Sequence, residues 1–206
     1  MSFTSYSDLK TSVANYLGRS DLTSVIPDFI KFAELRLSRD LRTRTMLNSA
    51  TTSTVGGDPK VAIPTDFSQI RDLFLQGNPR TPLTYMSPSS FTRNARADDS
   101  GRPVFYTMIA NEFVLAPIPD KAYTAEILYY VKPVEMSSTV PSNAFLANYP
   151  DALLYASLME AEPYLINDAR TATWADLYNR AIQNINDADQ GSEYAGIPLQ
   201  MTVTSR

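Results

Sequence analysis

The sequence predicts an α+β protein, a bundle of about four helices with an inserted antiparallel β-rich region and an extended C-terminal arm. Hydrophobic residues recur at helical spacing near both ends of the 206 residues and alternate in the middle. Ten of the fourteen prolines fall between Pro59 and Pro141. The charge balance changes from +2 over residues 1–50 to −5 over residues 145–206. We therefore expect N-terminal helices in 1–48, the β-rich region in 49–143, C-terminal helices in 144–190 and the arm in 191–206, with the basic first end packing on the acidic last end.

The composition argues against several kinds of chemistry. The chain has neither cysteine nor histidine, which removes disulfides, thiolate nucleophiles, the commonest general base and the preferred zinc ligand. No apolar run approaches the ~18 residues that span a membrane, and the start lacks the pattern of a signal peptide. The net charge of −4 disfavours a general nucleic-acid binder. These features predict a soluble protein, made in a cytosol-like compartment, with no membrane partner and no cofactor.

The first helix is expected over "SYSDLKTSVANYLG". Leu9, Val13, Tyr16 and Leu17 recur at helical spacing, and Gly18 is placed to end the helix in the left-handed conformation.

The second helix is expected to start near Ser24 as its N-cap, with Pro27 in the first turn. One narrow apolar stripe follows from the helical period: Ile26, Ile30, Ala33, Leu37 and Leu41. Phe32 and Leu35 fall roughly 140–160° away from that stripe. The helix therefore has apolar groups on two sides, which fits either a second interface or a helix buried on both sides within one chain.

Four arginines follow on the same helix or just after it: Arg36, Arg39, Arg42 and Arg44. Burial of the apolar stripe could contribute on the order of 10 kcal/mol, far more than surface ion pairs do. The arginines are therefore expected to be free for another role. Pairing with the acidic C-terminal helices, of this chain or a neighbour, is favoured over contact with a phosphate backbone.

Strands are expected where the hydrophobic period changes to two. "YTAEILYYV" places Tyr123, Ala125, Ile127, Tyr129 and Val131 on one face. "VFYTMI" and "EFVLAP" flank Ala110-Asn111, a hairpin turn in which Asn tolerates positive φ. With "KVAIP", "QIRDLFLQ" and "TPLTYMS", we expect one antiparallel sheet of five or six strands.

Helices are expected again after Pro150. Asp151 is the expected cap of "ALLYASLMEAEPYLI", in which Leu154, Leu158, Ala161 and Leu165 form a stripe and Pro163 predicts a kink or early stop. Asp168 is the expected cap of the last helix, with Gly191 as its terminator and these residues on its apolar face: Trp174, Leu177, Ala181, Ile185 and Ala188.

The last stretch is too short to build a core of its own. Its apolar residues alternate loosely, which favours an arm that adds to another surface: Tyr194, Ile197, Leu199, Met201 and Val203.

Two apparent motifs fail on inspection. Ser7 and Lys10 match an S-x-x-K pattern, but its companion motifs are missing. "NDADQG" lacks the ligands of a calcium loop, with Ile197 where a bidentate Glu belongs. We therefore predict no catalytic, cofactor or metal site.

The run "YLGRSDLTSVIPDFIKFAELRLSRDLRTRTM" (Tyr16–Met46) resembles the N-terminal signature of head-to-tail adaptor proteins of tailed, chiefly short-tailed, bacteriophages. The signature has an aromatic-Leu-Gly-Arg turn, an "IP-x-FI" helix start, "AE-x-R" and closing arginines. "IPTDFSQIRDLFLQG", "PVFYTMIANEFVLAPIP" and the paired helices over 151–186 follow in the expected order, so the resemblance covers nearly the whole chain to about residue 189.

The resemblance implies a virion protein of the neck, assembled in the host cytoplasm as a ring of twelve copies beneath the portal. Such a ring extends the DNA channel and offers a platform to tail or nozzle proteins, close to packaged DNA without reading its sequence. The arm then reaches the portal or another partner, while Phe32, Leu35 and the four arginines face a neighbouring copy or the channel mouth. The alternatives are a tail-tube or other neck component and, less favoured, a DNA-binding helical protein.

Overall fold

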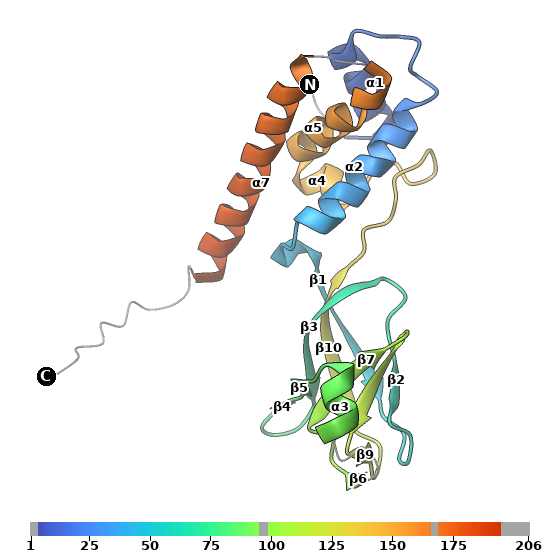
Figure 1. The fold of residues 1–206 in the computed structure, drawn as a ribbon, viewed down its shortest axis with the longest axis vertical. Helices are drawn as coiled ribbons and strands as arrows, with labels where there is room; N and C mark the ends of the chain where they lie inside the picture. Colours follow the sequence, from blue (N-terminus) through green and yellow to red (C-terminus); the bar gives the residue numbers. More distant parts are fainter. Residues whose placement is uncertain (1–3, 95–98, 166–168, 195–206) are drawn as a thin grey trace, which may run out of the picture. The chain divides into compact units, whose positions relative to one another are not determined.

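A computed structural model of the chain describes residues 4–94, 99–165 and 169–194. The chain divides into two compact units, one formed by residues 1–45 with 133–206 and the other by residues 46–132. We call them the helical unit and the β unit, since in the described residues the first holds six of the helices and the second all of the strands (Figure 1). The predicted α+β class is confirmed.

The helical unit is built around one largely buried helix, α5. Its elements are α1 (Tyr6–Leu17), α2 (Ile26–Asp40), α4 (Ala144–Asn148), α5 (Pro150–Glu160), α6 (Glu162–Leu165) and α7 (Arg170–Tyr194), and a single 3-10 turn, Arg44–Met46, follows α2. Helices α1, α2, α4 and α7 all contact α5. A helix enclosed in this way needs apolar residues all round, rather than the single stripe predicted for it. Half-buried Tyr155 and Met159 lie on one side of α5, and its buried residues cover the remaining part, about two thirds of its circumference: Ala152, Leu153, Leu154, Ala156, Ser157 and Leu158.

The helix ends agree only in part with the sequence-based expectations. Gly18 ends α1 with φ 67° and donates its N–H to Ala14 and Asn15, as predicted, but Tyr16 is exposed. Ser24 does not cap α2, whose N-cap is Val25 without a side-chain hydrogen bond. Pro27 lies in the first turn of α2, where its missing N–H is not needed.

The C-terminal helices also differ from the prediction at their ends. Asp151 lies in the first turn of α5, whose N-cap is Tyr149, because Pro150 already begins the helix. The expected early stop is confirmed, since α5 ends at Glu160 and Pro163 lies in the separate α6. The expected end of the last helix at Gly191 is wrong, because α7 continues to Tyr194. The predicted cap Asp168 lies outside the described residues.

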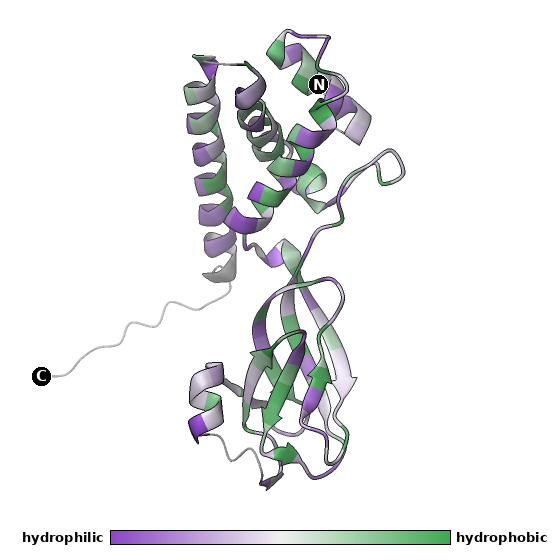
Figure 2. Ribbon diagram, turned by 45° about the vertical axis from the view of Figure 1, so that its right-hand side comes forward, coloured by the Kyte–Doolittle hydropathy of each residue, from purple (hydrophilic) through white to green (hydrophobic). Residues whose placement is uncertain are grey.

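One face of α7 packs on α5 through Trp174, Tyr178 and Ala181, which are buried. Leu177 and Ile185 are half-buried and Ala188 is exposed, so the predicted apolar face is covered only along its first half. Figure 2 shows hydrophilic and hydrophobic residues alternating along α2 and α7, as expected for helices that lie at the surface of a bundle.

The β unit holds two four-stranded sheets rather than the single sheet predicted. The first has the order β1-β10-β3-β4 and is antiparallel, and the second has the order β2-β8-β7-β5, with β5 parallel to β7. The strands are β1 (Leu47–Ser53), β2 (Lys60–Ala62), β3 (Phe67–Leu75), β4 (Thr81–Pro82), β5 (Thr84–Tyr85), β7 (Phe105–Ile109), β8 (Glu112–Ala116) and β10 (Thr124–Val131). A further parallel pair joins β6 (Ser100–Gly101) to β9 (Ile118–Pro119), and α3 (Pro88–Asn94) follows β5.

The core of the β unit lies between the two sheets. Leu73 and Ile127 from the first sheet and Phe113 and Leu115 from the second belong to one buried cluster. Phe67 packs edge-on against Phe113 across this core, with ring centroids 5.8 Å apart. The predicted inward face of β10 is confirmed for Ala125, Ile127 and Tyr129, which are all buried.

The predicted hairpin between β7 and β8 is confirmed, with a different residue at its strained position. Ala110, not Asn111, has the positive φ, at 54°. An L-residue with a Cβ adopts this region at a cost, so the sequence preference for Asn does not decide the turn here.

Candidate functional site

Helix α2 has a fully buried face, which the sequence predicted residue by residue. The five residues of the predicted stripe are at most 1% exposed: Ile26, Ile30, Ala33, Leu37 and Leu41. Phe29, placed between the two apolar sides, is also buried and packs edge-on against Tyr164 of α6 at 5.2 Å between centroids. This face belongs to the core of the helical unit and is not available to a partner.

The opposite face of α2 carries an exposed aromatic residue. Phe32 is 52% exposed, Leu35 is half-buried, and both Asp28 and Arg39 are exposed. These four residues follow the spacing i, i+4, i+7, i+11, so they form one stripe, which we call the outer face of α2. Phe32 is therefore not buried within its own chain, which rules out the alternative of a helix buried on both sides at this position.

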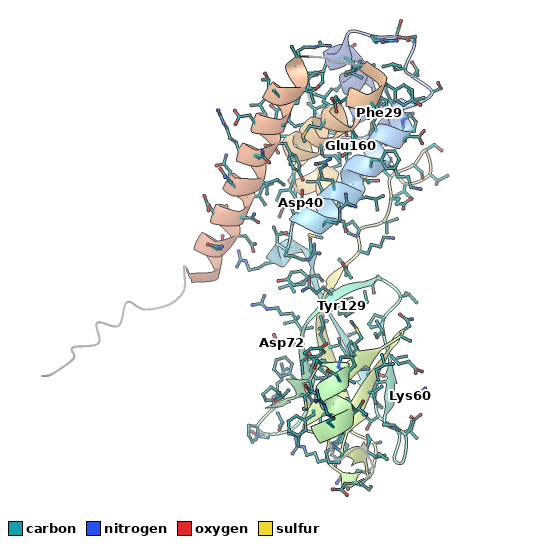
Figure 3. The ribbon with its side chains drawn as sticks, viewed as in Figure 1. Phe29, Asp40, Lys60, Asp72, Tyr129 and Glu160 are labelled. Carbon is teal, nitrogen blue, oxygen red and sulfur yellow. The ribbon has the colours of Figure 1, made fainter. Side chains whose placement is uncertain are left out.

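Two of the four arginines pair with acidic residues of the last helices. The Arg36 Nη2 atom lies 2.6 Å from Glu160 Oε1 at the end of α5, and Arg44 Nε lies 3.4 Å from Asp189 Oδ1 of α7. Figure 3 labels Glu160 on α5 and Asp40 on the neighbouring α2. The predicted pairing of the basic first end with the acidic last end is thus confirmed within one chain.

A third arginine serves the end of its own helix. Arg42 Nη1 donates to the carbonyl oxygens of Ser38 and Leu41, the second at 2.6 Å, where α2 leaves its last carbonyls without helical partners. Arg36 and Arg44 thus have the acidic partners that the sequence favoured, and Arg42 has carbonyl partners at the end of its own helix instead. Among the described residues, no hydrogen bond or ion pair involves the Arg39 side chain.

A buried carboxylate on α2, Glu34, has no counterpart among the residues singled out from the sequence. It is 6% exposed, accepts from the Met136 N–H at 3.2 Å and from Asn143 Nδ2 at 2.5 Å, and so holds the segment 133–143 against the helix. Burial raises the pKa of the Glu34 carboxyl to about 7, although both hydrogen bonds oppose the shift. The sequence could have indicated this burial, because Glu34 directly follows Ala33 of the predicted core stripe.

Asn143 links this clamp to the start of α4. Its side-chain oxygen accepts from the backbone N–H groups of Phe145 and Leu146, each at 3.1 Å, while its Nδ2 donates to Glu34 and to the Val134 carbonyl. All hydrogen-bonding positions of this amide side chain are therefore engaged in fixing the segment.

A second polar contact joins α7 to the end of α2. Tyr178 Oη donates to Asp40 Oδ2 at 2.6 Å. Burial, followed by this hydrogen bond and the charge of Asp40, raises the pKa of the Tyr178 hydroxyl, so Tyr178 stays a donor at neutral pH. Arg36 and Arg44 lie four residues before and after Asp40, at the spacing of a helical ion pair, but in the structure Asp40 accepts from Tyr178.

A groove of about 370 Å³ lies beside the second half of α7. Tyr149 and the Arg44–Asp189 pair border it, and Ile185 and Ala188 form its apolar part. It holds no cluster of nucleophile and base, and its polar atoms are those of ordinary surface contacts.

The first four residues of the predicted arm, 191–194, belong to α7. Tyr194 is the last residue of α7, and Ile197, Leu199, Met201 and Val203 lie outside the described residues. Asp187–Gly191 lie inside α7, which rules out a calcium loop there. Across the described ranges, no helix has the length and apolar character needed to cross a membrane.

The sequence model of the SU10 adaptor protein family matches residues 4–201 of this chain. No curated protein sequence matches it significantly.

Proposed function

Because the chain belongs to the SU10 adaptor protein family, we propose that it forms a ring of twelve copies beneath the phage portal, extends the DNA channel and carries the tail. The family match over residues 4–201 carries the proposal and bears out the resemblance to phage adaptor proteins. A structural adaptor has no need of a catalytic centre. Its partners would be the portal, tail or nozzle proteins and further copies of itself, in the virion neck, with assembly in the host cytoplasm.

The residues that carry the resemblance hold the helical unit together. Within "AE-x-R", Ala33 permits close helix packing, Glu34 clamps the segment 133–143, and Arg36 pairs with Glu160. Gly18 ends α1, and Arg19 pairs with Asp21 in the following turn. These residues of the signature thus serve the fold of the helical unit.

The outer face of α2 is the candidate contact between copies. A ring uses heterologous contacts, in which two different surfaces of each copy meet. An exposed Phe and an Arg without a described partner on one helix face have the composition typical of interface centres. Phe32, Leu35 and Arg39 thus remain proposed contacts. Arg36, Arg42 and Arg44 already have partners within their own chain, so a contact of theirs with a neighbouring copy would be made in addition to these bonds or in place of them.

The first test is mass photometry of the purified chain alone and with portal rings. Twelve copies per particle, or twelve added per portal, would support the ring. Phe32→Ala and Arg39→Ala should weaken assembly, while Tyr16→Ala and Arg180→Ala, an exposed aromatic and an exposed arginine elsewhere on the unit, should not.

A chain that stays monomeric and ignores the portal would overturn the proposal. Binding to tail components without the portal would instead favour a tail-tube or other neck protein. Salt-dependent binding of duplex DNA that falls on replacement of Arg39 would favour the DNA-binding alternative.

A further inference from the structure

The first sheet of the β unit has one edge that is long and unprotected. Strand β1 forms this edge, is seven residues long, and contains neither proline nor charge in its sequence LNSATTS. An edge strand of this kind presents unpaired N–H and C=O groups that can accept another strand.

The other sheet edges in the described part of the β unit are blunted. Strands β4 and β5 have two residues each, and β4 contains Pro82. Strand β2 has three residues, begins with Lys60 and lies between Pro59 and Pro64. Short strands, proline and lysine are the usual protection of sheet edges, so β1 stands out by lacking all three.

The hydrogen bonds show which groups of β1 face outward. The Thr54 N–H donates to the Tyr123 carbonyl at 2.9 Å, so at this end of the ladder the even-numbered residues face β10. The N–H and C=O groups of Ser49, Thr51 and Ser53 then point to the free edge. In agreement, the Ser49 N–H is taken by the side chain of Asn48 at 2.9 Å rather than by a strand.

Side chains around this edge are uncovered as well. Ser49, Thr51 and Ser53 are exposed, and Val55, two residues beyond the strand, is 63% exposed. Ala50 and Thr52 are half-buried, and Ala50 packs against the core. A strand added here would therefore continue a sheet with one apolar and one polar face.

The end of the chain has the sequence such a strand needs. Residues 197–205 read IPLQMTVTS and carry no charge. Ile197, Leu199, Met201 and Val203 would lie on the apolar face, and Gln200, Thr202 and Thr204 beside the exposed Ser and Thr residues of β1. Pro198 lacks an N–H, but a proline near the start of an outermost strand is tolerated.

We propose that residues 197–205 of one copy add as a strand to the free edge of β1 in a second copy. The inference rests on the proposed ring, which holds identical copies side by side, so that one repeated strand exchange joins each copy to the next. Main-chain hydrogen bonds would supply the affinity and the alternating apolar residues the register. The partner of the arm is then a neighbouring adaptor chain rather than the portal.

Cross-linking gives a direct test because the chain has no cysteine of its own. Thr51→Cys chains and Thr202→Cys chains would be mixed, assembled with portal rings or at high concentration, and treated with a bismaleimide that spans about 5–10 Å, one to two strand spacings. Only an exchange between chains can link the two single variants. The control is Thr81→Cys on β4, the opposite edge of the same sheet.

A cross-linked dimer with Thr51→Cys and not with Thr81→Cys is the expected result. Assembled rings without that dimer, a cross-link formed only inside a chain that carries both cysteines, or a cross-link from Thr202→Cys to the portal would each overturn the inference. Failure of ring assembly would count against the proposed function. The strand exchange would then be tested by the cross-link between chains at high concentration, without the portal.

A blocking variant gives a second readout. Thr51→Pro removes an outward N–H without removing a bond to β10, whereas Thr51→Val keeps that N–H. Loss of one main-chain hydrogen bond per contact should raise the concentration at half-assembly by about five- to tenfold for Thr51→Pro, with little change for Thr51→Val. Equal assembly of the two variants, with both folded by circular dichroism, would contradict the proposal.

Discussion

Replacing the buried carboxyl of Glu34 with an amide should make the protein more stable at alkaline pH and leave it nearly unchanged at acidic pH. Glu34→Gln keeps a side-chain oxygen that can accept from both Met136 and Asn143. It removes only the charge that burial disfavours. The substitution therefore isolates the cost of ionising this one group.

The sign follows from where the proton is released. The carboxyl titrates near 4.5 in the unfolded chain and near 7 in the folded protein, so the folded state binds more protons between these values. The contribution of Glu34 to stability is fully present below about pH 4.5 and is lost as the pH rises through about 7. The difference between a pKa of 4.5 and one of about 7 corresponds to on the order of 3 kcal/mol of stability.

Neighbouring charges do not change this sign. Glu135 raises the pKa of Glu34 and Lys31 lowers it, and these two residues pair with each other at 3.2 Å. Asp8, Asp21 and Asp120, whose pKa values are lowered, release their protons below this pH window in both states.

Urea unfolding followed by far-UV circular dichroism at about pH 5 and about pH 8 provides the assay. Glu34→Gln should raise the free energy of unfolding by about 2–3 kcal/mol at the higher pH and by less than about 1 at the lower. Glu135→Gln, an exposed neighbour, is the control and should show little dependence on pH. An equal effect of Glu34→Gln at both pH values would refute the reasoning.

Four further outcomes follow from the packing of the helical unit. Leu37→Ala, at a fully buried position, should lower the free energy of unfolding by about 2–5 kcal/mol, whereas Phe32→Ala should change it by less than about 1; equal losses in urea unfolding would contradict the assignment of the two faces of α2. Gly18→Ala should cost about 1 kcal/mol by the same assay because φ is 67° there, and Gly191→Ala, inside α7, should instead stabilise by up to about 1. Tyr178→Phe should cost about 0.5–1.5 kcal/mol because it removes the hydrogen bond to the exposed Asp40, and no loss in urea unfolding would contradict this contribution. Arg36→Ala should cost at most about 1 kcal/mol, since the pair with Glu160 is partly exposed, and thermal unfolding with and without high salt should show the difference shrinking.

The sequence by itself determined the features that depend on local periodicity. The core stripe of α2 and the inward face of β10 follow from side-chain directions that repeat every 3.6 and 2 residues, and Gly18 follows from the backbone conformation a helix end needs. The lack of histidine and cysteine argued against most catalytic chemistry, and the order of the signature elements indicated an adaptor, which the family match confirms.

The tertiary structure decided which partner each polar group has. Arg36 could pair with Asp40 at helical spacing, yet Arg36 pairs with Glu160 and Asp40 accepts from Tyr178. These partners come from α5 and α7, which place them within hydrogen-bond distance of α2. The burial of Glu34 depends on a segment about a hundred residues away in the sequence. The division of the strands into two sheets depends on which strands pair with each other. Long-range contacts of this kind leave no periodic trace, since they depend on packing between elements rather than on the repeat within one.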